Sequence, residues 1–176
     1  MKKSLWVSLL SLTLLLSASL VRAEEEAQQQ PFPEPGPEQK LLAQMTGEWD
    51  TKMNCQMSPT GPVEGTGTYT AKMGLNGYFL VCDLRATLGP MPFEGRAITG
   101  YDPFKKKYVG TWVDSMSPSL YSIEGEWDKA GKVYTETITG PDPTGKPMKF
   151  SMITEVKDAD HLASKMIMPG EDGKET

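Results

Sequence analysis

The sequence predicts an all-β protein, an antiparallel up-and-down β-barrel of about nine or ten strands with one short N-terminal helix. Apolar and polar side chains alternate over most of the chain from Glu48 onward, as in half-buried strands. The pair Asn76-Gly77, the strongest short hairpin signal, stands between two such runs. Turn residues recur at the spacing of a meander, and 17 glycines and 14 prolines argue against long helices. Short connections favour antiparallel neighbours, and closure into a barrel removes exposed sheet edges.

Residues 1–23 are typical of a secretory signal peptide. Lys2 and Lys3 precede an apolar run, and Val21-Arg22-Ala23 presents residues that a signal peptidase accepts. The apolar run is shorter than the roughly 18–20 residues that span a bilayer. We therefore expect cleavage after Ala23, secretion or export to the periplasm, and no membrane span in the mature chain. An uncleaved amphipathic anchor is the alternative.

The next two segments lead into the barrel. Residues 24–37 are acidic, Gln-rich and Pro-rich, a composition that predicts a disordered linker. Residues 38–46 carry three large apolar residues at helical spacing, which predicts one or two turns of helix ending at Gly47. The barrel domain is therefore expected to span residues 38–176.

The strands follow from alternation and turn chemistry. The first begins near Trp49, and the hairpin through Asn76-Gly77 pairs strands near 63–75 and 78–88. Its register places apolar residues together on one face, with Met73 opposite Leu80, Ala71 opposite Cys82, and Tyr69 opposite Leu84. Further strands are expected near 92–101, 107–116, 119–127, 132–139, 147–156 and 161–168.

The last residues carry turn chemistry without a strand to follow it. Pro169-Gly170 and Gly173 are typical of a hairpin turn, yet the sequence ends at Thr176. Two interpretations stay open, namely a disordered tail or a fragment that lacks its closing strand.

The charge balance excludes whole classes of partner. The segment up to Ala23 holds three basic and no acidic residues, so its removal changes the net charge from −5 to −8. An acidic domain offers no electrostatic footprint for nucleic acid or for an anionic membrane. The sequence does not indicate an oligomeric state.

The two cysteines are predicted to be free. Cys55 and Cys82 both belong to the inward face, but the strand near 63–75 separates them by about two strand spacings, roughly 9–10 Å. A disulfide reaches only about 7 Å between Cα atoms. We therefore expect two buried thiols.

Gly47-Glu48-Trp49, placed after a short helix, resembles the G-x-W motif that opens lipocalin-type barrels, in which the Trp plugs the closed end. The stretch 46–116 is also similar to a family of exported bacterial proteins of unknown function in the calycin (lipocalin-like) superfamily. The resemblance implies a fold, with structural roles for Gly47, Trp49, Asn76 and Gly77, and no activity. Besides the G-x-W motif, the residues that carry the resemblance to this family are 76–81, Gly100-Tyr101-Asp102 and 108–116.

The leading functional hypothesis is non-catalytic binding of a small, largely apolar molecule inside the barrel. Asp114 shares a strand face with Trp112 and is the candidate polar anchor, since a buried carboxylate needs a partner. The alternative for Asp114 is a bond to the turn that follows it. The predicted pocket lining consists of Met53, Cys55, Tyr69, Leu80, Cys82, Trp112, Asp114, Met116 and Trp127.

The competing hypotheses rest on weaker signals. A barrel filled by its own side chains and acting through its surface is the closest alternative. An acid/base pair drawn from Asp83, Asp114 and Glu136 would make an enzyme, and Cu(I) would suit sulfur ligands, but nothing fixes either geometry. His161, the single histidine, is expected to point outward beside the Asp158–Asp160 turn, which disfavours haem. We therefore predict no catalytic residues, no metal and no cofactor.

Overall fold

The computed structural model describes residues 34–55, 61–142 and 144–168. The predictions of a signal peptide (1–23) and of the tail (169–176) lie outside these residues, as does most of the predicted linker. Within the described residues, no helix is long and apolar enough to cross a membrane.

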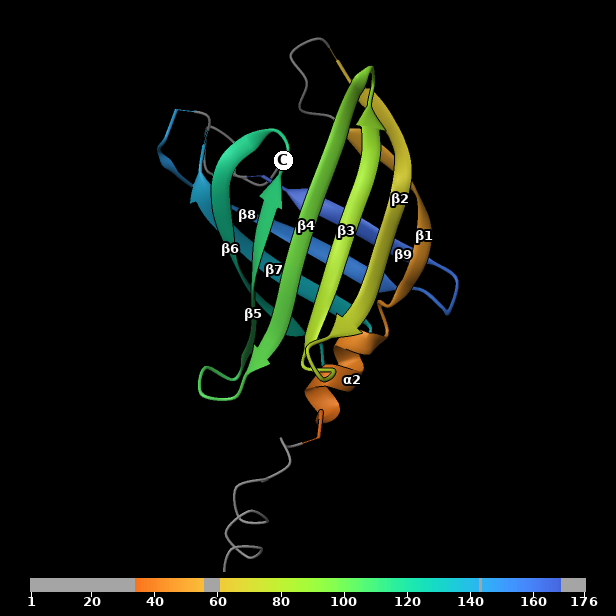
Figure 1. The fold of residues 1–176 in the computed structure, drawn as a ribbon, viewed down its shortest axis with the longest axis vertical. Coiled ribbons are helices and arrows are strands. Elements are labelled where there is room, and N and C mark those ends of the chain that lie inside the picture. Colours follow the sequence, from red (N-terminus) through yellow and green to blue (C-terminus); the bar gives the residue numbers. More distant parts are fainter. Residues whose placement is uncertain (1–33, 56–60, 143, 169–176) are drawn as a thin grey trace, which may run out of the picture. The chain divides into compact units, whose positions relative to one another are not determined.

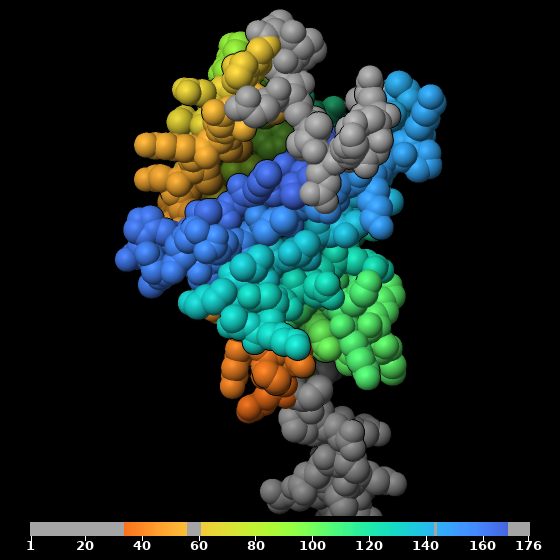
Figure 2. All heavy atoms as spheres, turned by 180° about the vertical axis from the view of Figure 1, so that it is seen from behind, coloured from red at the N-terminus to blue at the C-terminus, as the bar shows by residue number. Residues whose placement is uncertain are grey.

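Nine antiparallel strands follow one another in sequence order and curl into a half-barrel, which confirms the predicted fold class (Figure 1). The described parts of β1 and β9, at the two ends of this order, are not paired with each other. Figure 2 shows an opening between them, through which green residues of the opposite wall are visible. The strands are β1 (Gly47–Cys55), β2 (Val63–Gly74), β3 (Phe79–Leu88), β4 (Met91–Asp102), β5 (Lys107–Asp114), β6 (Ser117–Trp127), β7 (Val133–Pro141), β8 (Pro147–Val156) and β9 (Leu162–Ile167).

The register predicted for the first hairpin is confirmed: Tyr69 lies opposite Leu84, and Ala71 opposite Cys82. The turn itself is wider than the predicted two residues. Leu75, Asn76 and Gly77 all have positive φ, and pairing resumes only at Phe79. Asn and Gly tolerate this left-handed conformation, which explains why they stand at the tip.

The predicted strand 107–116 ends two residues early, at Asp114. The Asp114 carboxylate accepts hydrogen bonds from the amides of Met116 and Ser117 at 2.9 and 3.1 Å. A carboxylate that binds the next amides along the chain stabilises a turn, so the chain reverses here instead of continuing the strand.

Helix α2 (Pro37–Ala43) lies at one end of the half-barrel (Figure 1). Pro37 occupies its first turn, where a missing N–H costs nothing. Tyr108 of β5 donates a hydrogen bond to the Glu38 carbonyl at 3.0 Å, which ties the helix to the sheet. Leu42 is fully buried and Met45, just after the helix, is 6% exposed, so together they fill this end.

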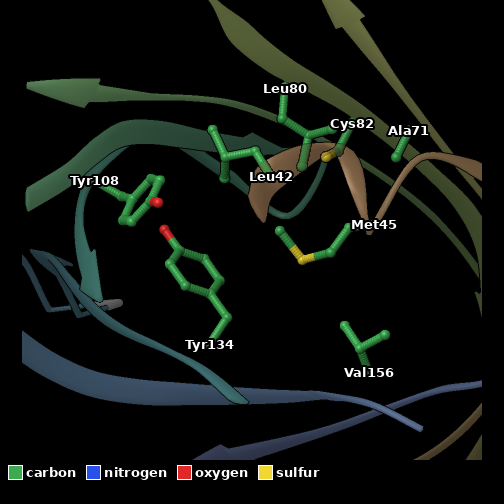
Figure 3. Close-up of a cluster of buried hydrophobic side chains, with 8 residues drawn as sticks. All are labelled: Leu42, Met45, Ala71, Leu80, Cys82, Tyr108, Tyr134 and Val156. Carbon is green, nitrogen blue, oxygen red and sulfur yellow. The ribbon is translucent and has the colours of Figure 1, made fainter. Parts of the chain in front are cut away.

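The core gathers beside the helix. Figure 3 shows its side chains converging from both walls of the curled sheet. Burying such residues is the main stabilising contribution in a domain of this size. The cluster consists of Leu42, Met45, Ala71, Leu80, Cys82, Tyr108, Tyr134 and Val156.

Candidate functional site

The concave face of the sheet has two regions that differ in burial. The filled end is the region beside α2, represented by Leu80, Tyr108 and Tyr134, which are 2–4% exposed. The open end is the other half, where inward-facing apolar side chains stay half-buried or exposed. The side chains of the first region are almost fully buried, whereas the described residues cover those of the second region only in part. The open end is defined by Met53, Phe93, Trp112, Tyr121, Phe150 and Met166.

Aromatic rings line the open end in two groups. Phe93 and Trp112 stack with centroids 6.4 Å apart, and Tyr121 meets Phe150 edge-on at 6.4 Å. The Trp112 ring lies over Gly95, because a β-carbon there would approach it to 2.2 Å. The missing side chain thus lets a large ring lie against the sheet, which leaves an aromatic surface suited to an apolar molecule.

A buried thiol and a phenol form one hydrogen bond deeper in the concave face. The Tyr69 hydroxyl donates to Cys82 Sγ at 2.8 Å. Burial raises the pKa of the Cys82 thiol to about 12, and burial together with the charge of Cys82 raises the pKa of Tyr69 well above its usual value. Because only a thiolate is a good nucleophile, Cys82 is inert at neutral pH.

Glu136 of β7 places a carboxyl group on this otherwise largely apolar inner face. It has the same orientation as its strand neighbours Tyr134 and Ile138, which are 2% and 6% exposed. Burial raises the pKa of Glu136 to about 7, and the Tyr134 hydroxyl opposes this shift only in part. Its negative charge in turn raises the pKa of Tyr69 and of Cys82, which belong to β2 and β3. Glu136 is therefore electrostatically coupled to the facing wall and titrates near neutral pH.

The Tyr134 hydroxyl is buried and has no hydrogen-bond partner among the described residues. It lies close enough to the Glu136 carboxyl for each group to shift the pKa of the other, but without the geometry of a hydrogen bond. Figure 3 shows it pointing toward the Tyr108 hydroxyl. A buried polar atom without a partner costs about 1–3 kcal/mol, and such atoms are rare in folded proteins.

No Lys or Arg side chain of the described strands faces inward. Strand alternation and the pairing registers place every strand Lys and Arg on the outer face, where all are exposed. Among the strand residues, Glu136 and Asp114 are the two carboxyl groups on the inner face. The carboxylate of Asp114 is already bonded, whereas Glu136 has no basic partner. The outward cations are Lys52, Lys72, Arg85, Arg96, Lys107, Lys149 and Lys165.

Several predicted pocket residues do lie on the inner face. Leu80 and Cys82 are buried, and Tyr69 and Trp127 pack against the same core. Met53 and Trp112 belong to the open end as defined above.

The predicted roles of three other residues need correction. Met116 is 62% exposed in the β5–β6 turn, so it does not line the interior. Cys55 is free as predicted but exposed, because it ends β1 away from the core. Asp114 accepts the Trp112 indole N–H at 2.8 Å in addition to two turn amides, so the structure shows the turn contact that was the alternative for this residue.

The residues predicted to be structural lie near the helix or in a turn. Trp49 is half-buried, packs over Gly47 and donates its indole N–H to the Met45 carbonyl at 3.3 Å. The end beneath α2 is instead filled by Leu42 and Met45. His161 is exposed and contacts Asp158 at 2.8 Å, as predicted.

The sequence reasoning named Asp114 as the candidate polar group of the interior and considered Glu136 only for an acid/base pair, although a signal for the burial of Glu136 was present. Tyr134, Glu136 and Ile138 alternate with three threonines, so period two places the carboxyl between two large apolar residues. A carboxyl flanked in this way on an apolar face marks a candidate site.

Comparison with known proteins identifies a family and no activity. A family model described as "Protein of unknown function (DUF1579)" matches residues 34–176, about four fifths of the chain. The chain belongs to this family. No curated protein gives a significant match. Among the described residues of this DUF1579 protein, no three His, Cys, Asp or Glu side chains are arranged to hold a metal ion.

Proposed function

We propose that this DUF1579 protein binds a small, largely apolar molecule within the concave face of its half-barrel, without catalysis. The observation that supports this best is the half-buried aromatic surface of the open end, which lies on the same inner face of the sheet as the Glu136 carboxyl. Ligand sites are typically apolar concavities with a few convergent polar groups.

The filled end supplies the rigid base that such a site needs. Its residues bury almost all of their surface, so a ligand at the open end would not have to replace the core of the domain. The binding role is further supported by the inert Cys82 thiol and by the engagement of Asp114 in a turn, because these leave Glu136 without a second reactive group. We also propose that the protein acts after export, on the evidence of residues 1–23.

The first test is native against denaturing mass spectrometry of the purified protein. A reproducible extra mass that disappears on denaturation supports a bound ligand and begins to identify it. A bare mass, together with no thermal shift from a panel of lipids and aromatic compounds, contradicts the proposal and favours a barrel that acts through its surface.

The second test is the substitution Trp112→Ala. Losing this ring is expected to weaken ligand binding about tenfold, the loss of roughly 1–1.5 kcal/mol of aromatic contact, while the domain stays folded. The matched control is Val113→Ala, since Val113 is the next residue on the outer face and is 41% exposed. Binding by titration calorimetry and folding by circular dichroism separate the two effects. Equal binding by both variants would place the ligand elsewhere.

A further inference from the structure

The inner face of the sheet combines a carboxyl group with a complete lack of cations among the described strands. Glu136 points inward from β7, and every strand Lys and Arg points outward. A buried carboxylate without a positive partner is costly, and proteins normally compensate it with an Arg, a Lys or a metal ion. Among the described residues, no strand Lys or Arg shares the inner face with Glu136, and no three His, Cys, Asp or Glu side chains are grouped to hold a metal ion.

The surroundings of Glu136 are also those that a cation prefers. Tyr69 and Tyr134 lie near enough for the Glu136 charge to act on both, and Tyr108 meets Tyr134 edge-on with centroids 5.5 Å apart. Aromatic faces attract organic cations, most strongly where water is excluded.

We propose, resting on the proposed function, that the ligand of the concave face is an organic amine with an apolar body, whose ammonium group pairs with Glu136 while its body lies against the rings of the open end. The ligand itself supplies the positive charge that the inner face lacks. A neutral alcohol of the same shape keeps the apolar contact and loses the ion pair, and a carboxylate is repelled.

The proposal carries a definite pH dependence. The groups that face Glu136 are Tyr69 from β2, Cys82 from β3 and Tyr134 from its own strand, and burial keeps all three neutral through neutral pH. The inward neighbours from β6 and β8 are Gly125 and Met152, which do not titrate. Glu136 is therefore the group whose ionisation, near pH 7, controls amine binding. Amine affinity should fall about tenfold per pH unit below that value and level off above it.

The test uses three probes of one shape, octylamine, octanol and octanoate, titrated against the full protein at pH 8 with tryptophan fluorescence as the readout. Octylamine is expected to bind about 10- to 100-fold more tightly than octanol, and octanoate most weakly. In Glu136→Gln, which keeps the size of the side chain, octylamine should fall to the affinity of octanol. Glu126→Gln is the matched control, since it removes the same charge from the outer face of the adjacent strand.

The outcomes separate this inference from the function on which it rests. Equal binding of octylamine and octanol, tighter binding of octanoate, or an octylamine affinity that does not change between pH 5.5 and pH 8 would overturn the amine assignment and leave apolar binding intact. Failure of all three probes to bind would count against the proposed function itself. The pH profile of the unmodified protein keeps the test decisive even where Glu136→Gln alters folding.

Discussion

The filled end and the open end of the concave face are built from the same strands, yet they differ in how deeply their side chains are buried. Beside α2, Leu42 and Met45 enter between the walls and bring their neighbours to a few per cent exposure. At the other end no helix enters among the described residues, and Phe93, Trp112 and Phe150 stay half-buried. The difference shows how one short helix at an end of a curled sheet buries the side chains beside it and leaves those of the other end only partly covered.

Glu136 lies where the two regions meet. On the same strand Tyr134 belongs to the filled end, and the Glu136 side chain is still half-buried. Its carboxyl is deep enough for its pKa to rise to about 7. A carboxyl group at such a boundary changes its charge near neutral pH.

The largest expected effect comes from removing a side chain at the filled end. Leu80→Ala should lower the free energy of unfolding by about 2–5 kcal/mol, because Leu80 is 2% exposed and its loss leaves a cavity. Phe150→Ala at the open end should lower the free energy of unfolding clearly less, since the Phe150 ring is only half-buried. Urea denaturation measures both. Equal losses would mean that the two ends are one continuous core.

The second largest effect is a pH dependence of stability caused by Glu136, which lies between the filled end and the open end. The pKa of Glu136 is about 7 in the folded protein against 4.5 for the ordinary side chain, so between these values the folded state holds a proton that the unfolded state has released. The neutral carboxyl therefore makes its full contribution to the free energy of unfolding below pH 4.5. That contribution decreases as the pH rises from 4.5 to about 7, by up to about 3 kcal/mol in total.

Glu136→Gln should remove this decline, so the variant becomes the more stable protein at pH 8 and the difference narrows at pH 5. Denaturant midpoints of both proteins across this range provide the measurement. Parallel pH curves for the two proteins would show that the carboxyl is solvated and would weaken the contrast between the ends.

The smallest effect is expected on the outer face. Arg96 pairs with Asp83 at 2.6 Å, but the two side chains are 60% and 37% exposed. Exposed ion pairs contribute little, so Arg96→Ala should leave the free energy of unfolding unchanged within the error of the measurement and leave ligand binding unaltered. Thermal unfolding at low and high salt checks this. A larger loss would show that the outer face contributes to stability as the filled end does.

Local patterning accounts for how much of the fold could be predicted. Alternation placed all nine strands near their observed positions, and the Asn76-Gly77 signal led to the correct pairing of Tyr69 with Leu84. These features depend on period two and on backbone dihedrals that few residues tolerate, which neighbouring residues alone can dictate. The boundary at Asp114 was missed because it depends on side-chain bonds to the following amides.

The sequence by itself determined the strand order, the inward set of side chains and the outward direction of the cations, because alternation along each strand decides these. Only the tertiary structure decided which inward residues are buried and which carboxyl group has a raised pKa. Met116 and Cys55 share the inward pattern but end up exposed, since the chain turns or ends a strand there. Glu136 acquires its raised pKa from walls that are distant in sequence, and burial of this kind arises only when the sheet curls and the helix enters one end of it.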